Sequence, residues 1–356
     1  MVRGGLSGSQ TRPRLSPRER LLLALAGHPT DRPPVICPGG MMTMATQSAM
    51  RATGCSWPEA HSDAKAMARL VLATREETSL ECLSVPFCMT VEAEALGCTV
   101  DLGNATVLPH VSAEALQGPG DLAELPSFDP ARSGRSPVVL EALAILRAAN
   151  LPYPVIGAVV GPVSLAAMVM EAGQFLRLAR RAPPLAEALI SRMEEVTLGF
   201  ALAQHSAGAD CVMIAEPTAT GEVLGGKHFG KLARPALCRI LRALRETCIP
   251  TILHICGDLR PLLGELRELV RMVGGPLAIS VDAMVSGRTL REGLPGCVAV
   301  GNVDAVLLER GAPSTIEKVA RAAARDFQVV SPACGLVPTT PAANLRALVR
   351  ASTGGA

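Results

Sequence analysis

The sequence predicts a single (β/α)8 barrel of the TIM type, in which eight parallel strands alternate with helices. Eight short apolar runs recur along the 356 residues, and amphipathic stretches of helical period separate most neighbouring runs. The alternative is a doubly wound open sheet, which usually has fewer strands and a Gly-rich phosphate loop after the first one. No such loop occurs here, so we expect one barrel domain over residues 16–356, after a disordered tail over residues 1–15.

The barrel domain is expected to open with a short helix. Ser16 can cap this helix, Pro17 suits its first turn, Glu19 completes a capping box and Gly27 ends it. In chain order, the predicted strands are Pro34–Cys37, Cys82–Pro86, Val155–Val160, Asp210–Ala215, Pro250–Cys256, Pro276–Asp282, Cys297–Val303 and Phe327–Pro332. The helices between them are clearest at Ala64–Glu77, Leu185–Ala203, Ala233–Thr247, Pro261–Val273 and Pro313–Arg325.

After the second strand, the sequence predicts a hairpin on the rim of the barrel. Residues Gly97–Gly103 and Thr106–Leu108 alternate in the manner of two hairpin arms. Residues 112–136 are rich in Pro, Gly, Ser and Asp, so we expect a rim loop with little regular structure. Glu92 and Glu94, which precede the hairpin, are interpreted as solvated loop residues.

Charge and composition argue against a nucleic-acid or membrane partner. Lys and Arg number 34 against 32 Asp and Glu, and the aromatic residues are one Trp, one Tyr and six Phe, so no basic or base-stacking surface is indicated. The longest uncharged stretch, Ala148–Met170, is interrupted by Pro152, Pro154 and Gly161-Pro162 and predicts a strand and a helix start. The N-terminal residues lack the apolar run of a secretory signal. We therefore expect a cytoplasmic protein.

The residues that point most directly to chemistry are His254 and Cys256, at the end of an apolar run. Side chains at positions i and i+2 of a strand point to the same side, so these two can bind one ion. Gly257 and Asp258 turn the chain after the pair, which places it at the C-terminal mouth of a barrel, where barrel enzymes have their active sites. Eleven cysteines, an odd number, favour thiols and metal ligands over a disulfide framework.

Cys334, at the end of the eighth predicted strand, offers a third ligand at the same rim. One imidazole and two thiolates favour zinc, and three protein ligands leave the fourth tetrahedral position open, as in catalytic zinc sites. The alternative is a buried thiol and a structural histidine. Carboxylates at suitable rim positions are Glu216, after the fourth strand, and Asp282, at the end of the sixth. We expect them to accept the proton of a substrate bound at the metal or to supply a weak fourth ligand.

Other motifs accompany the three candidate ligands, at residues Gly27–Val35, Trp57–His61, Val85–Glu94, Gly161–Ala166 and Gly301–Asp304. Together they resemble the uroporphyrinogen decarboxylase superfamily, and within it the zinc-dependent methylcorrinoid:coenzyme M methyltransferases. The resemblance runs from about Ser16 to Val349. In these methyltransferases a His-x-Cys pair and a distant Cys bind zinc. The decarboxylases have no such site and rely on an N-terminal arginine cluster, whereas residues 38–44 of this chain contain no Arg.

The resemblance implies methyl transfer from a methylated corrinoid to a thiol held at Zn²⁺, such as coenzyme M. A separate corrinoid protein is the expected donor, because the chain has no Asp-x-His-x-x-Gly cobalamin motif. Three alternatives stay open: a uroporphyrinogen decarboxylase-type lyase, a corrinoid methyltransferase with another acceptor such as tetrahydrofolate, and a non-catalytic barrel that binds a corrinoid protein.

Overall fold

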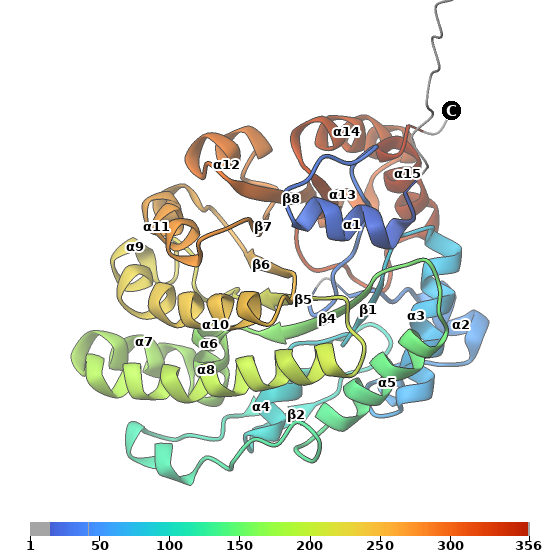
Figure 1. The fold of residues 1–356 in the computed structure, drawn as a ribbon. Coiled ribbons are helices and arrows are strands. Elements are labelled where there is room, and N and C mark those ends of the chain that lie inside the picture. Colours follow the sequence, from blue (N-terminus) through green and yellow to red (C-terminus); the bar gives the residue numbers. More distant parts are fainter. Residues whose placement is uncertain (1–14, 42, 355–356) are drawn as a thin grey trace, which may run out of the picture.

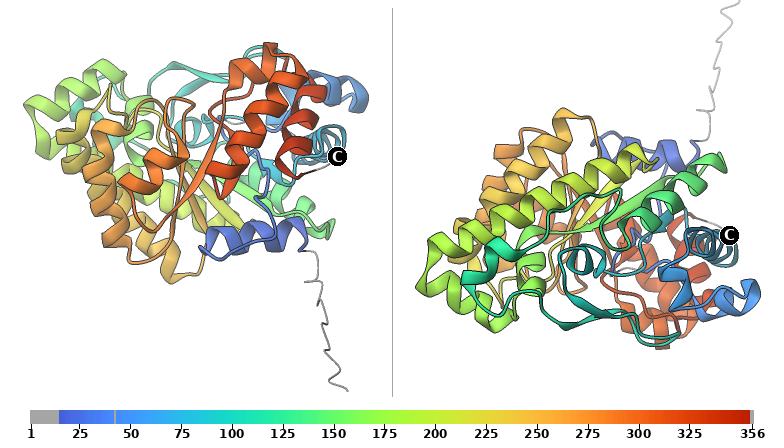
Figure 2. Two further views of the ribbon diagram at one scale, coloured as in Figure 1. Left: turned by 90° about the horizontal axis from the view of Figure 1, so that it is seen from above. Right: turned by 90° about the horizontal axis from the view of Figure 1, so that it is seen from below.

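The computed structural model describes residues 15–41 and 43–354, so most of the predicted N-terminal tail lies outside the described residues. Its centre is a curled parallel sheet of seven strands in the order β1-β4-β5-β6-β7-β8-β9. Helices surround this sheet (Figure 1), and two further views show the same arrangement (Figure 2). The strands are β1 (Leu83–Val85), β4 (Val155–Val160), β5 (Cys211–Ala215), β6 (Thr251–Ile255), β7 (Leu277–Val281), β8 (Cys297–Val303) and β9 (Val329–Pro332).

The helices alternate with these strands as an α/β fold requires. The α-helices are α1 (Pro17–Leu25), α2 (Gln47–Thr53), α3 (Ala64–Thr78), α4 (Val91–Ala95), α5 (Ser136–Ala148), α6 (Pro162–Val169), α7 (Ala172–Arg181), α8 (Pro183–Ser206), α9 (Gly225–His228), α10 (Arg234–Glu246), α11 (Leu263–Val273), α12 (Gly287–Gly293), α13 (Ala305–Arg310), α14 (Pro313–Asp326) and α15 (Ala342–Ser352). Short 3-10 turns lie at η1 (Glu59–His61), η2 (Pro119–Glu124) and η4 (Arg260–Leu262), and η3 (Phe229–Ala233) is a π-helical turn. The predicted helices are confirmed to within a few residues at each end.

The predicted capping box of the first helix is confirmed. The Ser16 hydroxyl accepts a hydrogen bond from the Glu19 N–H at 3.2 Å, and the Glu19 carboxylate accepts the Ser16 N–H at 2.9 Å. Two donors at the start of α1 are thereby satisfied, which sets where the helix begins.

The first predicted strand, Pro34–Cys37, is wrong as a regular strand. Only Val35 forms a bridge, which is parallel and pairs it with Val330. The physical reason is the loss of backbone donors: Pro34 has no N–H, the Val35 N–H donates to the Glu81 carboxylate at 3.0 Å, and the Cys37 N–H points to the Cys82 sulfur at 3.2 Å.

The same segment nevertheless links the two edges of the seven-stranded sheet. The Ile36 N–H donates to the Val330 carbonyl of β9 at 2.9 Å, and the Glu81 N–H, just before β1, donates to the Val35 carbonyl at 2.9 Å. The sheet is therefore bridged between β9 and β1 by main-chain hydrogen bonds on both sides of this segment.

An antiparallel pair follows α4, but its second strand differs from the predicted one. The pair consists of β2 (Thr99–Asp101) and β3 (His110–Ala113), so Thr106–Leu108 is not the second arm. The Asn104 side chain accepts the N–H groups of Thr106 and Val107 and closes a turn there. Val107 forms only an isolated antiparallel bridge, with Asn104, and the strand that pairs with β2 begins at His110.

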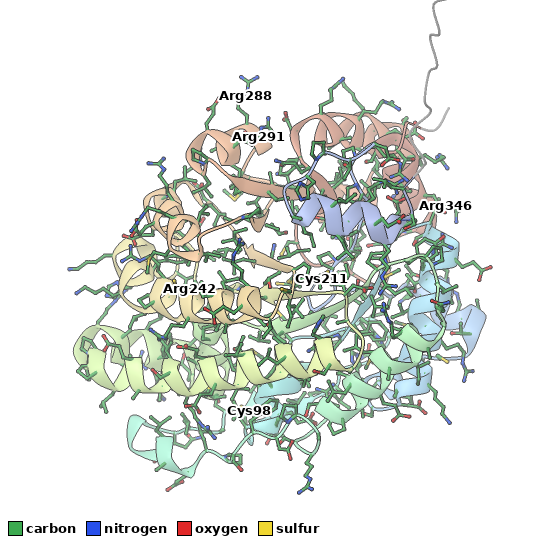
Figure 3. The ribbon with its side chains drawn as sticks, viewed as in Figure 1. Cys98, Cys211, Arg242, Arg288, Arg291 and Arg346 are labelled. Carbon is green, nitrogen blue, oxygen red and sulfur yellow. The ribbon has the colours of Figure 1, made fainter. Side chains whose placement is uncertain are left out.

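The interior is mostly apolar, and most charged side chains lie on the surface. Every residue of β4, β5 and β7 is buried, as expected for parallel strands covered by helices. Figure 3 shows Cys211 among the inner strands, whereas Arg242 on α10 and Arg288 on α12 belong to exposed outer helix faces. None of the helices formed by the described residues combines the length and hydropathy needed to cross a bilayer.

Candidate metal centre

The structure brings His254, Cys256 and Cys334 together. The His254 Nε2 lies 3.2 Å from the Cys256 sulfur, and the two cysteine sulfurs are 3.4 Å apart. One ligand atom from each residue lies within 4.8 Å of the other two, and no other group of three or more potential ligands is found in the described chain. His254 is fully buried, whereas both cysteines are partly exposed. The imidazole of the set is therefore anchored in the protein interior, and its two sulfurs are partly accessible to solvent.

The parallel sheet explains why residues 78 positions apart meet. His254 is the last residue of β6 that pairs with β5, and Cys256 comes directly after β6 ends. Cys334 comes two residues after β9 ends. The carboxyl ends of parallel strands lie at one edge of a curled sheet, so ligands from β6 and β9 face each other there.

His254 is oriented by a serine on the neighbouring strand. β6 and β7 pair in a register that places Ser280 opposite His254, and the Ser280 Oγ lies 3.0 Å from the His254 Nδ1. Ser280 is fully buried. The contact leaves Nε2 to face the cysteines, the arrangement in which a metal-binding histidine is held through its second nitrogen. Sequence reasoning missed Ser280, although it is the one polar residue within the apolar strand Leu277–Val281.

The two thiols act on one another as a pair. A hydrogen bond from Cys256 lowers the pKa of Cys334, and the neighbouring His254 lowers it further. The same hydrogen bond, together with burial, raises the pKa of Cys256. Cys334 therefore loses its proton more readily than an ordinary cysteine, whereas Cys256 retains its proton. A cation bound between the sulfurs would displace that proton.

Asp282, a predicted site residue, lies beside this set. Its carboxylate accepts the N–H of Gly257 at 3.3 Å, directly after Cys256. Gly257 has φ of +72°, a conformation that favours glycine and turns the chain away from β6. The Asp282 carboxylate thus contacts the backbone of the residue that directly follows the candidate ligand Cys256.

Glu216, the other predicted carboxylate, is not brought together with the cysteines. It is fully buried, and its oxygens accept the Val163 N–H at 2.9 Å, the Ser164 N–H at 3.0 Å and the Ser164 hydroxyl at 2.7 Å. These donors form the start of α6, so the carboxylate caps that helix. Burial raises the pKa of Glu216 to about 7 despite these hydrogen bonds.

The interpretation of Glu92 as a solvated residue is wrong. Glu92 is buried, accepts the Val160 N–H at 2.7 Å at the end of β4, and has its pKa raised by burial to about 8. Glu94 is partly exposed and pairs with Arg135 at 2.6 Å. The error arose because Glu92 meets the end of β4, 68 residues along the chain, and no local sequence pattern predicts that contact.

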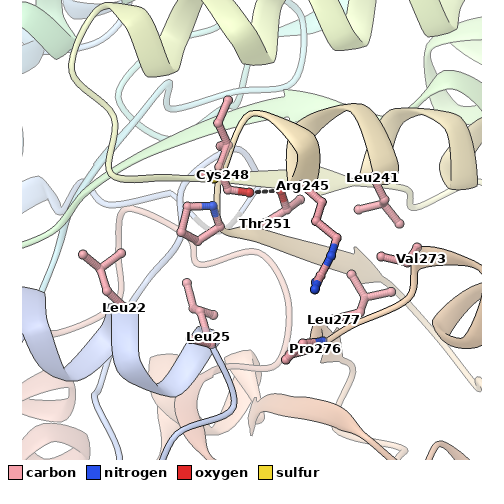
Figure 4. A pocket seen from close by; sticks show the side chains of 12 residues that line it. Leu22, Leu25, Leu241, Arg245, Cys248, Thr251, Val273, Pro276 and Leu277 are labelled. Carbon is pink, nitrogen blue, oxygen red and sulfur yellow. Dashed lines mark hydrogen bonds between the residues drawn. The ribbon is translucent and has the colours of Figure 1, made fainter.

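The cavity in Figure 4 lies away from the candidate ligands. It measures about 370 Å³ and is lined by Leu22 and Leu25 of α1, Arg245 of α10, and residues that precede or begin β6 and β7, such as Thr251 and Pro276. The amino ends of the strands lie at the face opposite the candidate ligands. In parallel α/β sheets, ligand sites lie at the carboxyl ends of the strands, which is the face that carries the candidate ligands.

Comparison with known proteins agrees with this architecture. The family model of uroporphyrinogen decarboxylase (URO-D) matches residues 16–354. The methylcobamide:CoM methyltransferase MtbA of Methanosarcina acetivorans is 34% identical over 340 residues, which cover 94% of this chain and 96% of the relative. MtaA of Methanosarcina barkeri, also a methylcobamide:CoM methyltransferase, is 31% identical over 341 residues, or 94% and 96% of the two chains. A solved methyltransferase from Methanosarcina mazei has a TM-score of 0.87 at 30% identity and covers 96% of this chain and 99% of its own. The chain therefore belongs to the uroporphyrinogen decarboxylase family.

Proposed function

We propose that this protein is a methyltransferase that moves a methyl group from a methylated corrinoid to a thiol such as coenzyme M. The observation that carries the proposal is the convergence of His254, Cys256 and Cys334 within 4.8 Å at the carboxyl ends of β6 and β9. The names of the relatives, methylcobamide:CoM methyltransferases matched over nearly their whole length, support the same activity. A separate corrinoid protein is the proposed donor, because the chain lacks an Asp-x-His-x-x-Gly motif of its own.

His254, Cys256 and Cys334 are the proposed Zn²⁺ ligands. The donor set of one nitrogen and two sulfurs is that of catalytic zinc sites with three protein ligands. Zinc bonds of about 2.0–2.3 Å place tetrahedral ligands about 3.5 Å apart. The distances of 3.2 Å and 3.4 Å at Cys256 fit this spacing. When bound there, zinc would lower the pKa of a substrate thiol and hold it as a reactive thiolate.

The two predicted carboxylates take different roles in this proposal. Asp282, beside Cys256, is proposed to accept the proton of the incoming thiol or to serve as a weak fourth ligand. Glu216 was expected to act likewise, but its oxygens are engaged by three donors of α6. We therefore propose that Glu216 supports the site indirectly, by holding the start of α6 against β5.

We also propose that residues 16–356 form one closed (β/α)8 barrel. The segment Pro34–Cys37 would serve as the eighth strand of this barrel. It is hydrogen-bonded to β9 on one side and to Glu81, before β1, on the other. The β2–β3 pair would then be an excursion from the rim after the second strand of the barrel.

Zinc content and methyl transfer test the proposal together. We expect about one Zn²⁺ per chain in the wild type and little in Cys256→Ala and Cys334→Ala, because loss of one of three ligands leaves a weak site. Cys297→Ala is the matched control, since Cys297 begins β8 at the opposite end of the sheet. Wild type and control should demethylate methylcobalamin with coenzyme M, and the two ligand variants should not.

The assay also separates the alternatives. Methyl transfer to tetrahydrofolate but to no thiol would identify a different acceptor. Decarboxylation of uroporphyrinogen by a zinc-free wild type would instead favour the lyase. A wild type that binds no zinc and demethylates nothing would contradict the proposal.

A further inference from the structure

Cys256 is held less firmly by the sheet than the other candidate ligands. The pairing of β6 with β7 ends at Ile255 and Val281, one residue before Cys256. In contrast, the Ala333 N–H, just before Cys334, donates to the Val303 carbonyl of β8 at 2.8 Å. The position of the Cys256 sulfur therefore depends on the turn that follows it, at Gly257 and Asp258.

That turn is held from both sides by carboxylates on loops after the neighbouring strands. The Gly257 N–H donates to Asp282, after β7. The next N–H, that of Asp258, donates to the Glu222 Oε1 at 2.8 Å, and Glu222 lies on the loop after β5. The latter is the shorter contact and has the charge-assisted character that makes such hydrogen bonds strong. The hydrogen bond also lowers the pKa of Glu222, so this carboxylate is charged at neutral pH.

The loop after β5 also fits closely against the turn. A Cβ added to Gly257 would lie 2.8 Å from the Glu222 carboxylate, and one added to Gly221 would lie 2.8 Å from the Asp258 carbonyl. A side chain at residue 221 would therefore press against the backbone of the turn, and one at residue 257 would displace the Glu222 carboxylate. Glycines at these two positions thus let Glu222 reach the backbone directly after a candidate ligand.

We infer that Glu222 is a positioning residue for the metal centre, whose carboxylate fixes the turn at Asp258 and thereby the Cys256 sulfur. The inference rests on the proposed function in one respect, the assignment of Cys256 as a metal ligand. Glu222 itself donates no ligand atom to the set, so its effect is on metal affinity and on coordination geometry. Partners of this kind typically change metal affinity about 10–100-fold when removed.

The test compares Glu222→Ala and Glu222→Gln with the wild type. Zn²⁺ affinity is measured by competition with a chromophoric chelator, and geometry by the visible absorption of the Co²⁺-loaded protein. Because Glu222 is exposed, we expect Glu222→Ala to fall at the low end of the range, with about tenfold weaker affinity and altered Co²⁺ bands. Glu222→Gln retains an oxygen acceptor and should restore most of the affinity and the wild-type spectrum.

Glu171→Ala is the matched control. Glu171 is also an exposed glutamate that accepts backbone N–H groups, those of Gly173 and Gln174, but it caps α7 and not the turn after Cys256. Its loss should leave both metal readouts unchanged. Wild-type affinity and an unchanged Co²⁺ spectrum in Glu222→Ala would overturn the inference and leave the proposed function standing. A wild type that takes up no metal would overturn both.

Discussion

Glu216→Gln separates a structural role of Glu216 from a catalytic one. The carboxylate accepts three hydrogen bonds from Val163 and Ser164. At pH 4.5 or below the folded wild-type group is a neutral carboxyl, whose hydroxyl oxygen can still accept the Val163 N–H. A glutamine can keep the two hydrogen bonds to Ser164 through its oxygen, but its NH2 group then faces the Val163 N–H, donor against donor. A buried donor left without a partner costs about 1–3 kcal/mol, so at pH 4.5 or below we expect the variant to be less stable by that amount.

The difference should change with pH. Burial raises the pKa of Glu216 from 4.5 to about 7, so between these values the folded protein binds more protons than the unfolded chain. The contribution of this group to stability is therefore fully present below pH 4.5 and is lost as pH rises through about 7. A shift of this size corresponds to about 3 kcal/mol. Because glutamine does not titrate, the variant should approach or exceed wild-type stability near pH 8.

Urea unfolding of both proteins from pH 4.5 to 8.5 measures this difference, and methyl transfer is assayed on the same preparations. We expect the free-energy difference to close with rising pH, and zinc content to stay at the wild-type level. A variant with unchanged stability at every pH but little methyl transfer would refute the structural role. It would indicate that Glu216 acts in catalysis.

Two further predictions concern contacts around the same strands. Ser280→Ala removes the partner of the His254 Nδ1, so Zn²⁺ affinity should fall about 10–100-fold in chelator competition, and equal affinity would show that Ser280 does not orient the imidazole. In Gly161→Ala the new Cβ would lie 2.2 Å from the Glu216 Cγ, which should destabilise the fold by about 1–3 kcal/mol in urea unfolding. The control for the latter is Gly199→Ala, at a site on α8 with no atom within 4 Å of the added Cβ, where a gain of up to about 1 kcal/mol is expected. Equal effects at the two glycines would contradict the predicted overlap with Glu216.

The regular elements could be predicted because their signals are local. The strand β4 is a continuous apolar run, and α14 begins with Pro313 in its first turn, so each could be located from its own residues. The segment Pro34–Cys37 looked the same locally, yet it pairs irregularly because Glu81 and Cys82 take its backbone donors. Those partners lie more than 40 residues away, beyond the range of any local pattern.

The roles of the two carboxylates show the same limit. Glu216 and Asp282 both follow apolar strands, and from the sequence they are equivalent candidates. The difference between them is one of direction: one carboxylate meets the start of α6, and the other meets the turn after Cys256. Side-chain direction beyond a strand end depends on which loop packs there, and that packing is set by the whole fold.

By itself, the sequence determined the order of strands and helices, the alternation that makes the sheet parallel, and the three residues whose chemistry suits zinc. These follow from local periodicity and from the side chains themselves. Only the tertiary structure decided that Ser280 orients His254, that Glu222 reaches the turn after Cys256, and that Glu216 caps a helix. Each of these contacts joins different strand-end segments, and their distances exist only once the strands have paired in register and the sheet has curled.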